Sequence, residues 1–258
     1  MPSYRRLALA LLLSIAWAGP AHADRRYFVH SYTPYLATAG SLELEAGSFA
    51  AYGRGDSVAT AWHNHLEFEY GITDRLTGAA YLNFVQTADP NAASRFDGPS
   101  LELIYRLAEP GRLPVDPAVY VEVRENGDEF EIEPKLLLAL RYYRLVSVLN
   151  IAGEFERHFS GDDRGITEKN LRVTAGLARE FGHVVAFGVE AVYERPGFTS
   201  DPATSALYVG PSVNLQTPRV QMALGWQPQV SGHPATTRGL NLHAFPRSEV
   251  RLIIGVDL

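Results

Sequence analysis

The chain has 258 residues and no cysteine, and its 23 Lys and Arg against 29 Asp and Glu give a formal net charge of −6. The absence of cysteine excludes thiolate metal sites, thiol catalysis and a disulfide scaffold. The acidic balance argues against nucleic acid as a partner, because neutralising phosphates requires clustered Lys and Arg.

The first 23 residues have the features of a secretory signal peptide. Arg5 and Arg6 precede an apolar run at 7–18, and Ala21-His22-Ala23 matches an A-x-A cleavage pattern. A run of about a dozen apolar residues is too short to span a bilayer as a helix. We therefore expect export and cleavage after Ala23. Loss of the two arginines takes the net charge from −6 to about −8.

The mature chain, residues 24–258, is expected to be one domain, because no Pro/Gly/Ser-rich linker or abrupt change of composition divides it. Residues 24–40 are expected to form a periplasmic N-terminal segment. From there on the dominant pattern is the period-two alternation of β-strands. About twelve alternating stretches are predicted, at 41–52, 62–70, 76–84, 100–107, 119–124, 129–138, 149–159, 171–180, 185–194, 207–215, 220–227 and 250–258.

The lengths of the strands and links predict a membrane barrel. With flanking residues each strand is expected to have about ten to fifteen residues, whereas strands of soluble sheets usually have five or six and a tilted membrane strand needs about nine to eleven. Short links also alternate with long ones, with mild departures at 108–117 and 126–128, as in outer-membrane barrels with short periplasmic turns and longer outer loops. The short links are 71–75, 142–144, 181–183 and 217–219, and the longer ones include 86–97, 160–168, 196–205 and 230–247.

The predicted fold class is therefore all-β, as a single antiparallel transmembrane β-barrel. Lipid offers no hydrogen bonds, so strands in a membrane must pair on both edges, which forces closure. The apolar face of each strand then points to lipid and the polar face to the lumen. In water, a barrel of about twelve strands would enclose an interior too wide for side chains to fill. A two-sheet sandwich remains the alternative.

Three segments carry a resemblance to known proteins: YGITDRL (70–76), GVEAVYE (188–194) and LYVGPSVNL (207–215). They resemble bacterial outer-membrane β-barrels of the transporter or porin-like kind, and the first is similar to a turn of the phenol-degradation-pathway outer-membrane family. The resemblance implies the outer membrane of a Gram-negative bacterium, contact with its lipid and lipopolysaccharide, and insertion by the barrel-assembly machinery. Such barrels usually end in an aromatic residue, whereas this chain ends in Leu258.

Polar residues on the inward faces predict a lumen lining and thereby a porin-like or transporter-like channel for small solutes. Acidic residues predominate, and rings of carboxylates favour cations. The alternative is a structural barrel in which these charges pair and plug the interior. The predicted lining residues are His63, His65, Glu67, Glu69, Glu102, Arg106, Glu122, Arg124, Glu131, Glu133, Glu154, Glu156, Arg172 and Glu190.

Within this lining, His63, His65, Glu67 and Glu69 fall on one face of one strand. Imidazole and carboxylate are plausible zinc or copper ligands, and same-face neighbours lie about 6.6 Å apart. The simpler interpretation is a polar wall in contact with water. No cofactor is expected, and His63 and His65 are the first candidates if an ion binds.

An enzymatic alternative rests on His158, Ser160 and Asn170. Outer-membrane phospholipase A, also a twelve-strand barrel, resembles this arrangement, with a His-x-Ser pair and an Asn on the next strand. A base beside a serine is the general requirement for acyl transfer. Here, however, Gly161 follows the serine where that enzyme has Asn, and the alternation turns His158 toward the lumen. The main expectation is therefore a protein that is not an enzyme.

Overall fold

The structure is a computed structural model that describes residues 25–54, 60–86, 93–161, 164–197 and 203–258. The predicted signal peptide lies outside these residues. In the described part of the chain no helix is long and apolar enough to cross a membrane. The strands are β1 (Leu42–Tyr52), β2 (Thr60–Thr73), β3 (Leu76–Gln86), β4 (Arg95–Arg106), β5 (Asp116–Glu125), β6 (Glu129–Tyr142), β7 (Leu145–His158), β8 (Thr167–Phe181), β9 (Val185–Arg195), β10 (Ser205–Gln216), β11 (Val220–His233) and β12 (Ser248–Asp257).

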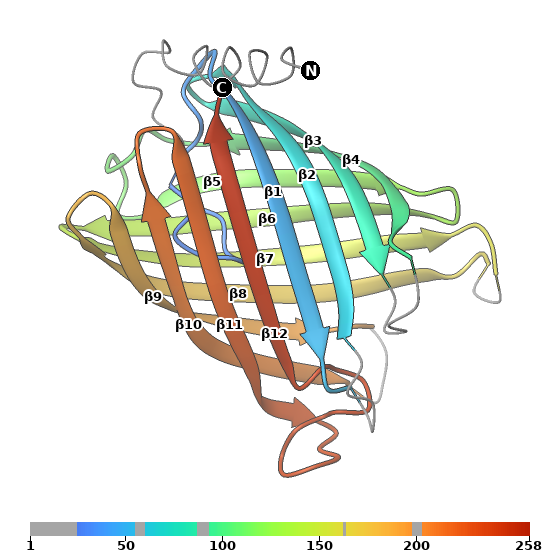
Figure 1. Ribbon diagram of the computed structural model, residues 1–258. Coiled ribbons are helices and arrows are strands. Elements are labelled where there is room, and N and C mark those ends of the chain that lie inside the picture. Colours follow the sequence, from blue (N-terminus) through green and yellow to red (C-terminus); the bar gives the residue numbers. More distant parts are fainter. Residues whose placement is uncertain (1–24, 55–59, 87–92, 162–163, 198–202) are drawn as a thin grey trace, which may run out of the picture.

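These strands form one closed antiparallel barrel (Figure 1). Each strand pairs with its neighbours in sequence, and β12 pairs with β1 from Glu43 opposite Asp257 to Tyr52 opposite Ser248. Closure leaves no unpaired edge, as a strand surrounded by lipid requires. The prediction of a single antiparallel barrel of about twelve strands is confirmed.

Several strands extend beyond the alternating stretches of the sequence. β8 begins at Thr167 rather than at the first apolar residue of the pattern, and it reaches 15 residues. Its first residues still pair with β7, with Glu168 opposite Glu156. Backbone pairing does not depend on an outward apolar side chain, so the strand continues where the sequence pattern stops.

The two ends of the barrel differ in their connections. At one end, called the turn end, the links 74–75, 143–144, 182–184 and 217–219 are short and only 107–115 is longer. Tyr143 (φ 53°) and Gly182 (φ 73°) have the left-handed backbone that such tight turns need. The opposite end, called the loop end, carries the connections 53–59, 87–94, 126–128, 159–166, 196–204 and 234–247.

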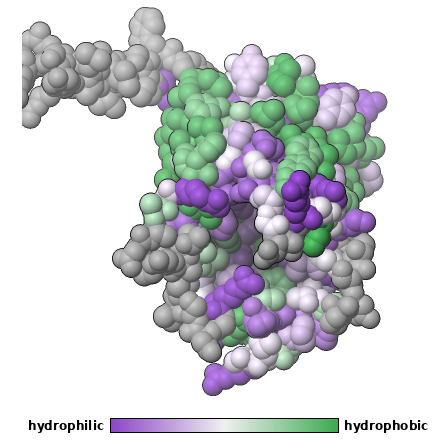
Figure 2. Space-filling view, turned by 90° about the vertical axis from the view of Figure 1, so that its right-hand side faces the viewer, coloured by the Kyte–Doolittle hydropathy of each residue, from purple (hydrophilic) through white to green (hydrophobic). Residues whose placement is uncertain are grey.

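The outer face of the barrel is apolar. Leu101, Phe187 and Leu177 are 60, 56 and 53% exposed, and they belong to a large set of exposed apolar side chains that point away from the barrel. Leaving such a side chain in water forgoes roughly 1.5–3 kcal/mol, so a surface of this kind suits lipid. Figure 2 shows this apolar surface around a hollow lined by hydrophilic residues.

The N-terminal segment lies inside the barrel. Residues 25–41, called here the N-terminal plug, precede β1 at the turn end and fold into the bore (Figure 1). Tyr27, Phe28 and Val29 are at most 3% exposed. The sequence prediction of a periplasmic segment at 24–40 did not include this position inside the barrel. The segment has no strand alternation, so the sequence pattern contained no sign of its docking partners.

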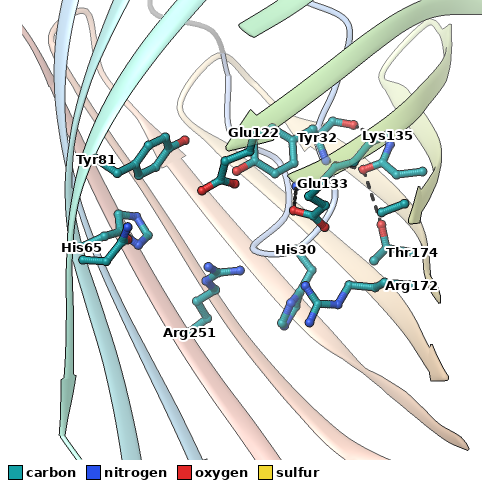
Figure 3. Close-up of a pocket in the computed structure, with 13 residues that line it drawn as sticks. His30, Tyr32, His65, Tyr81, Glu122, Glu133, Lys135, Arg172, Thr174 and Arg251 are labelled. Carbon is teal, nitrogen blue, oxygen red and sulfur yellow. Dashed lines mark hydrogen bonds and ion pairs between the residues drawn. The ribbon is translucent and has the colours of Figure 1, made fainter. Parts of the chain in front are cut away.

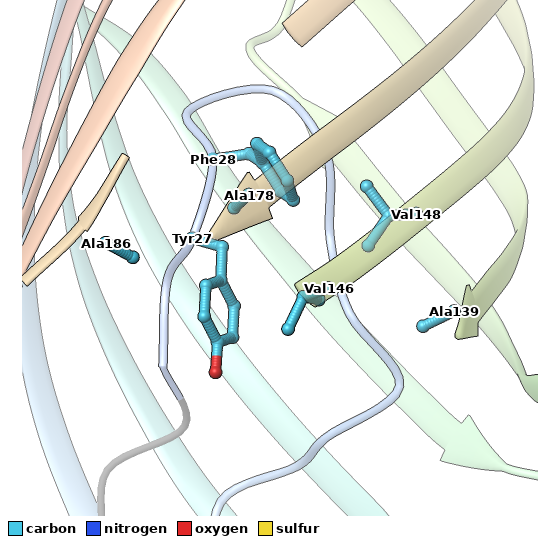
Figure 4. Packing of buried hydrophobic residues seen from close by; sticks show 7 residues of the cluster. All are labelled: Tyr27, Phe28, Ala139, Val146, Val148, Ala178 and Ala186. Carbon is cyan, nitrogen blue, oxygen red and sulfur yellow. The ribbon is translucent and has the colours of Figure 1, made fainter. Parts of the chain in front are cut away.

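Apolar contacts hold the plug against the wall. Tyr27 and Phe28 pack on a cluster from β6 to β9 that includes Val146 and Val148 (Figure 4). A side chain at Gly176 of β8 would meet the Phe28 ring at 2.6 Å, so the missing Cβ makes room for the ring. Two further contacts of the plug are Tyr32 and Leu36 against Tyr120 and Leu137, and Val29 against Ala223 and Ile253. The loop between β11 and β12 packs separately on the wall, with Phe245 against Val192 and Tyr208.

Candidate functional site: a polar vestibule above an N-terminal plug

Glu190 of β9 is the central polar anchor of the plug. Its carboxylate accepts hydrogen bonds from the backbone N–H groups of Val29 (3.2 Å), His30 (3.1 Å) and Ser31 (2.6 Å). Glu190 is 0% exposed. An irregular segment inside a barrel has no neighbouring strand to satisfy its backbone, so wall side chains must do so.

Other wall residues continue this pattern along the plug. Asn150 of β7 accepts from the N–H of Tyr32 (2.6 Å) and donates to its carbonyl (3.0 Å). Gln221 of β11 accepts from the N–H of Arg26 (2.9 Å). The Tyr27 hydroxyl donates to the carboxylate of Glu180 in β8. The plug is thus held by residues of several strands and lies in the turn half of the bore.

On the loop-end side of the plug, the bore is hollow. A cavity of about 500 Å³, called here the vestibule, is lined by residues such as Phe49, His63 and Asp97. A second cavity of about 160 Å³, called the inner cavity, reaches Lys135 and Asn150. The two adjoin, because six residues line both: His30, His65, Asn83, Glu122, Arg172 and Arg251.

Most charges of the vestibule are paired. Arg124 reaches Asp97, Glu129 and Glu131, each at 2.8 Å. Arg172 lies 3.1 Å from Glu194. In total the vestibule is lined by more acidic than basic residues: Asp97, Glu122, Glu129, Glu194 and Glu249 against Arg124, Arg172 and Arg251.

The plug contributes His30 to the lining of the vestibule. Figure 3 shows His30 of the plug beside Arg172, with Arg251 and His65 on other walls. Burial lowers the pKa of His30 well below its usual value, and the charges of Arg251 and Arg172 lower it further. His30 Nε2 also lies 3.7 Å from the Glu249 carboxylate. Arg251 also donates to the Val29 carbonyl (3.0 Å), so the vestibule wall contacts the plug directly.

The residues predicted to line the lumen lie on the inner face, but in three different surroundings. His63, His65, Glu122, Arg124, Glu133 and Arg172 line the vestibule or the inner cavity. Glu67, Glu102 and Glu190 are 2% exposed or less, in the part of the bore that holds the plug. The remaining ones are Glu131, Glu154 and Glu156 toward the loop end and Glu69 and Arg106 toward the turn end.

The two candidate metal-binding histidines are in different environments. His63 lies opposite Phe49 of β1, and the two rings pack with centroids 5.7 Å apart. His65 lies within reach of two carboxylates, Glu45 of β1 and Glu67 of its own strand. The alternation in the sequence predicted both histidines on one face of β2. The pairing of β2 with β1 then places His63 beside Phe49 and His65 beside Glu45.

The residues of the enzymatic alternative have other partners. The Ser160 hydroxyl donates to Asp128 at 2.6 Å, and Asn170 donates to Glu154 at 2.7 Å. His158 lies 3.7 Å from Glu129. In the described chain no hydrogen bond joins Ser160 to His158, so these residues do not form the serine–base pair that acyl transfer needs.

Sequence reasoning did not single out several residues of this site. Tyr81, Asn83 and Arg251 have inward positions that the alternation could have identified. His30 and Tyr32 could not be found in this way, because they belong to the irregular plug and line the cavities only through its fold.

One family model matches residues 20–258, and its description is a family of unknown function (DUF6662). No curated protein matches the chain. The fold is similar to that of the COG4313 outer membrane channel from Pseudomonas putida F1, with a TM-score of 0.64, 12% identity, and coverage of 87% of this chain and 98% of that one. It is also similar to the NanC porin (TM-score 0.58, 10% identity, coverage 84% and 100%). The KdgM porin in complex with disordered oligogalacturonate is a third (TM-score 0.56, 8% identity, coverage 84% and 99%).

At such low identities the likeness concerns the fold alone. It confirms the resemblance to outer-membrane channel and porin barrels at that level. The finer similarity to the phenol-degradation-pathway family is not confirmed, because the matching family model is a different one.

Proposed function

The chain belongs to the family of unknown function DUF6662, and we propose that it is an outer-membrane channel that takes small polar solutes into its vestibule and passes them when the plug moves. The observation that carries this proposal is the pair of adjoining polar cavities inside a closed barrel whose outer face is apolar. A purely structural barrel has no need of a hollow lined by charged residues.

The plug is the barrier in this proposal. The cavities extend from the loop half of the bore to His30 and Tyr32, the residues of the plug that face them. Passage therefore requires that residues 25–41 move aside or rearrange. Segments that gate binding sites are held by a limited set of contacts, and here those contacts are the Phe28 cluster and the hydrogen bonds to Glu190 and Asn150.

Planar-bilayer recordings test the channel. Phe28→Ala removes a 0% exposed ring, and such a truncation costs roughly 3–5 kcal/mol of packing. We expect brief or rare openings in the parent protein and at least a tenfold higher open probability in F28A. The matched control is Phe187→Ala, since Phe187 is 56% exposed on the outer face. The channel would be rejected if neither the parent nor F28A conducts while heat-modifiable migration in gels shows that both barrels are folded.

The excess of acidic residues in the vestibule supports a preference for cations. Arg124 is held by Asp97 and Glu129, so D97N/E129Q exposes more positive charge to the solute. Reversal potentials in a KCl gradient should show K⁺ preference in the parent and a shift toward chloride in this double variant. Asp74→Asn is the control, because Asp74 is exposed in the 74–75 link at the turn end, outside the vestibule. A chloride-selective parent channel would contradict the cation preference.

A further inference from the structure

The inner wall brings one imidazole and two carboxylates together from two neighbouring strands. Ligand atoms of Glu45, His65 and Glu67 all lie within 4.8 Å of one another. The register explains how this happens. Glu45 pairs directly with Glu67, and His65 pairs with Gly47. A side chain at Gly47 would collide with the His65 ring, so the glycine lets the imidazole lie over β1 toward Glu45.

Two of the atoms in this group are buried and lack hydrogen-bond partners. They are Oε2 of Glu67, a residue only 2% exposed, and Nε2 of His65. His65 Nε2 lies 3.7 Å from Glu45 Oε1, which is too long for a hydrogen bond. A buried polar atom without a partner costs about 1–3 kcal/mol. Because one ligand atom of each residue lies within 4.8 Å of the others, a single ion among these side chains is a candidate partner for both.

The geometry points to a divalent transition-metal ion, and we propose that Glu45, His65 and Glu67 bind one. A tetrahedral zinc ion lies about 2.0–2.2 Å from nitrogen and oxygen ligands, which places those ligands about 3.4 Å from each other. The His65 Nε2–Glu45 Oε1 separation is 3.7 Å, and all three ligand atoms lie within 4.8 Å of one another, so the side chains must close by at most about 1.4 Å to reach this geometry. A mixed set of imidazole and carboxylate suits Zn²⁺ or Co²⁺ better than Ca²⁺ or Mg²⁺, which take oxygen ligands.

The surrounding charges are consistent with a dication. Arg26 of the plug donates to Glu45 Oε1 at 3.2 Å, and a carboxylate has enough lone pairs to accept this bond and bind an ion. Glu102, like Glu45, acts electrostatically on Glu67. A divalent ion bound to Glu45 and Glu67 would relieve the repulsion between these carboxylates.

The site is reachable from the vestibule. His65 lines both the vestibule and the inner cavity, so an ion that enters from the loop end meets the imidazole first. Two other groups of acidic and histidine side chains lie nearer the loop end. There, Arg124 already binds Glu129 and Glu131, and no member of those groups is as deeply buried as Glu67.

Metal titration of the full barrel tests this inference. The detergent-solubilised protein is stripped with a chelator and titrated with Co²⁺, followed by visible absorbance, and with Zn²⁺ by calorimetric competition. We expect one ion per barrel in the parent. The variants His65→Asn and Glu67→Gln should bind at least tenfold more weakly. His63→Asn is the matched control, because it removes the other imidazole of β2 and should leave the affinity unchanged.

Three outcomes would overturn the site: no saturable Co²⁺ or Zn²⁺ binding in the parent, unchanged affinity in both H65N and E67Q, or an equal loss in H63N. The first would mean that Arg26 and a shared proton neutralise Glu45 and Glu67 instead. Glu67→Gln is nearly isosteric, and heat-modifiable migration reports whether each barrel has folded. Conductance of the same samples is measured independently. The channel hypothesis can therefore be contradicted while metal binding is confirmed, and metal binding can be contradicted while the channel is confirmed.

Discussion

Replacement of Glu190 by Gln should release the N-terminal plug. In the present structure Oε1 accepts from the N–H groups of His30 and Ser31, and Oε2 accepts from Val29. Glutamine keeps one carbonyl oxygen but turns an amide group toward the remaining N–H. At least one bond is therefore lost, and the negative charge that strengthened the others is removed.

The size of the effect follows from these contacts. A hydrogen bond to a charged group contributes about 1.5–3 kcal/mol, so we take about 2 kcal/mol for the bond lost in E190Q. Since about 1.4 kcal/mol changes an equilibrium tenfold, the population of barrels with an undocked plug should rise roughly 30-fold. The barrel itself should stay folded, because the backbone pairing of β9 with β8 and β10 is unchanged.

Thiol modification measures this population. The chain contains no cysteine, so Ala37→Cys, at a plug position 5% exposed, provides a single reporter. When docking is fast relative to labelling, the labelling rate by a water-soluble thiol reagent is proportional to the undocked fraction. We expect a rate roughly 30-fold higher in A37C/E190Q than in A37C alone.

The control is Glu102→Gln, since Glu102 is also buried but accepts a hydrogen bond from Tyr81 of the wall rather than from the plug. Its labelling rate should stay near that of A37C. If E190Q changes the rate less than about twofold, or if E102Q accelerates it equally, Glu190 does not hold the plug by these hydrogen bonds and the reasoning is refuted.

Two further predictions concern the wall and the loop end. Gly176→Val should displace the Phe28 ring, which a Cβ there would meet at 2.6 Å, and should accelerate labelling of A37C. Gly153→Ala, whose added Cβ would meet the Phe155 ring at an ordinary 3.4 Å, should not, and equal effects of the two would argue against the close fit. Because Ser160 donates to Asp128 and not to the His158 imidazole, we expect no phospholipid hydrolysis by the parent protein and none by Ser160→Ala. Hydrolysis by the parent that S160A abolishes would restore the enzymatic interpretation.

Much of the barrel follows from local rules that the sequence displays. The position of each strand and the face to which each side chain points follow from the alternation, because the pleat turns successive side chains to opposite faces. Thus His63, His65, Glu67 and Glu69 were assigned to one face of β2, and β1 is paired with that strand in the predicted antiparallel arrangement. Strand ends were less predictable, as at Thr167, because pairing outside the lipid leaves no apolar signature.

The sequence by itself determined the period-two pattern, the acidic inner face, the apolar outer face and the alternation of short and long links. Lipid and backbone hydrogen bonding then leave only a closed barrel. Only the tertiary structure decided that residues 25–41 fill the turn half of the bore, because the partners of this segment, such as Glu190 and Asn150, lie more than a hundred positions away. It also decided that His65 meets Glu45 while His63 packs on Phe49. The physical reason is that cross-strand register and the gap at Gly47 select which same-face neighbours can touch.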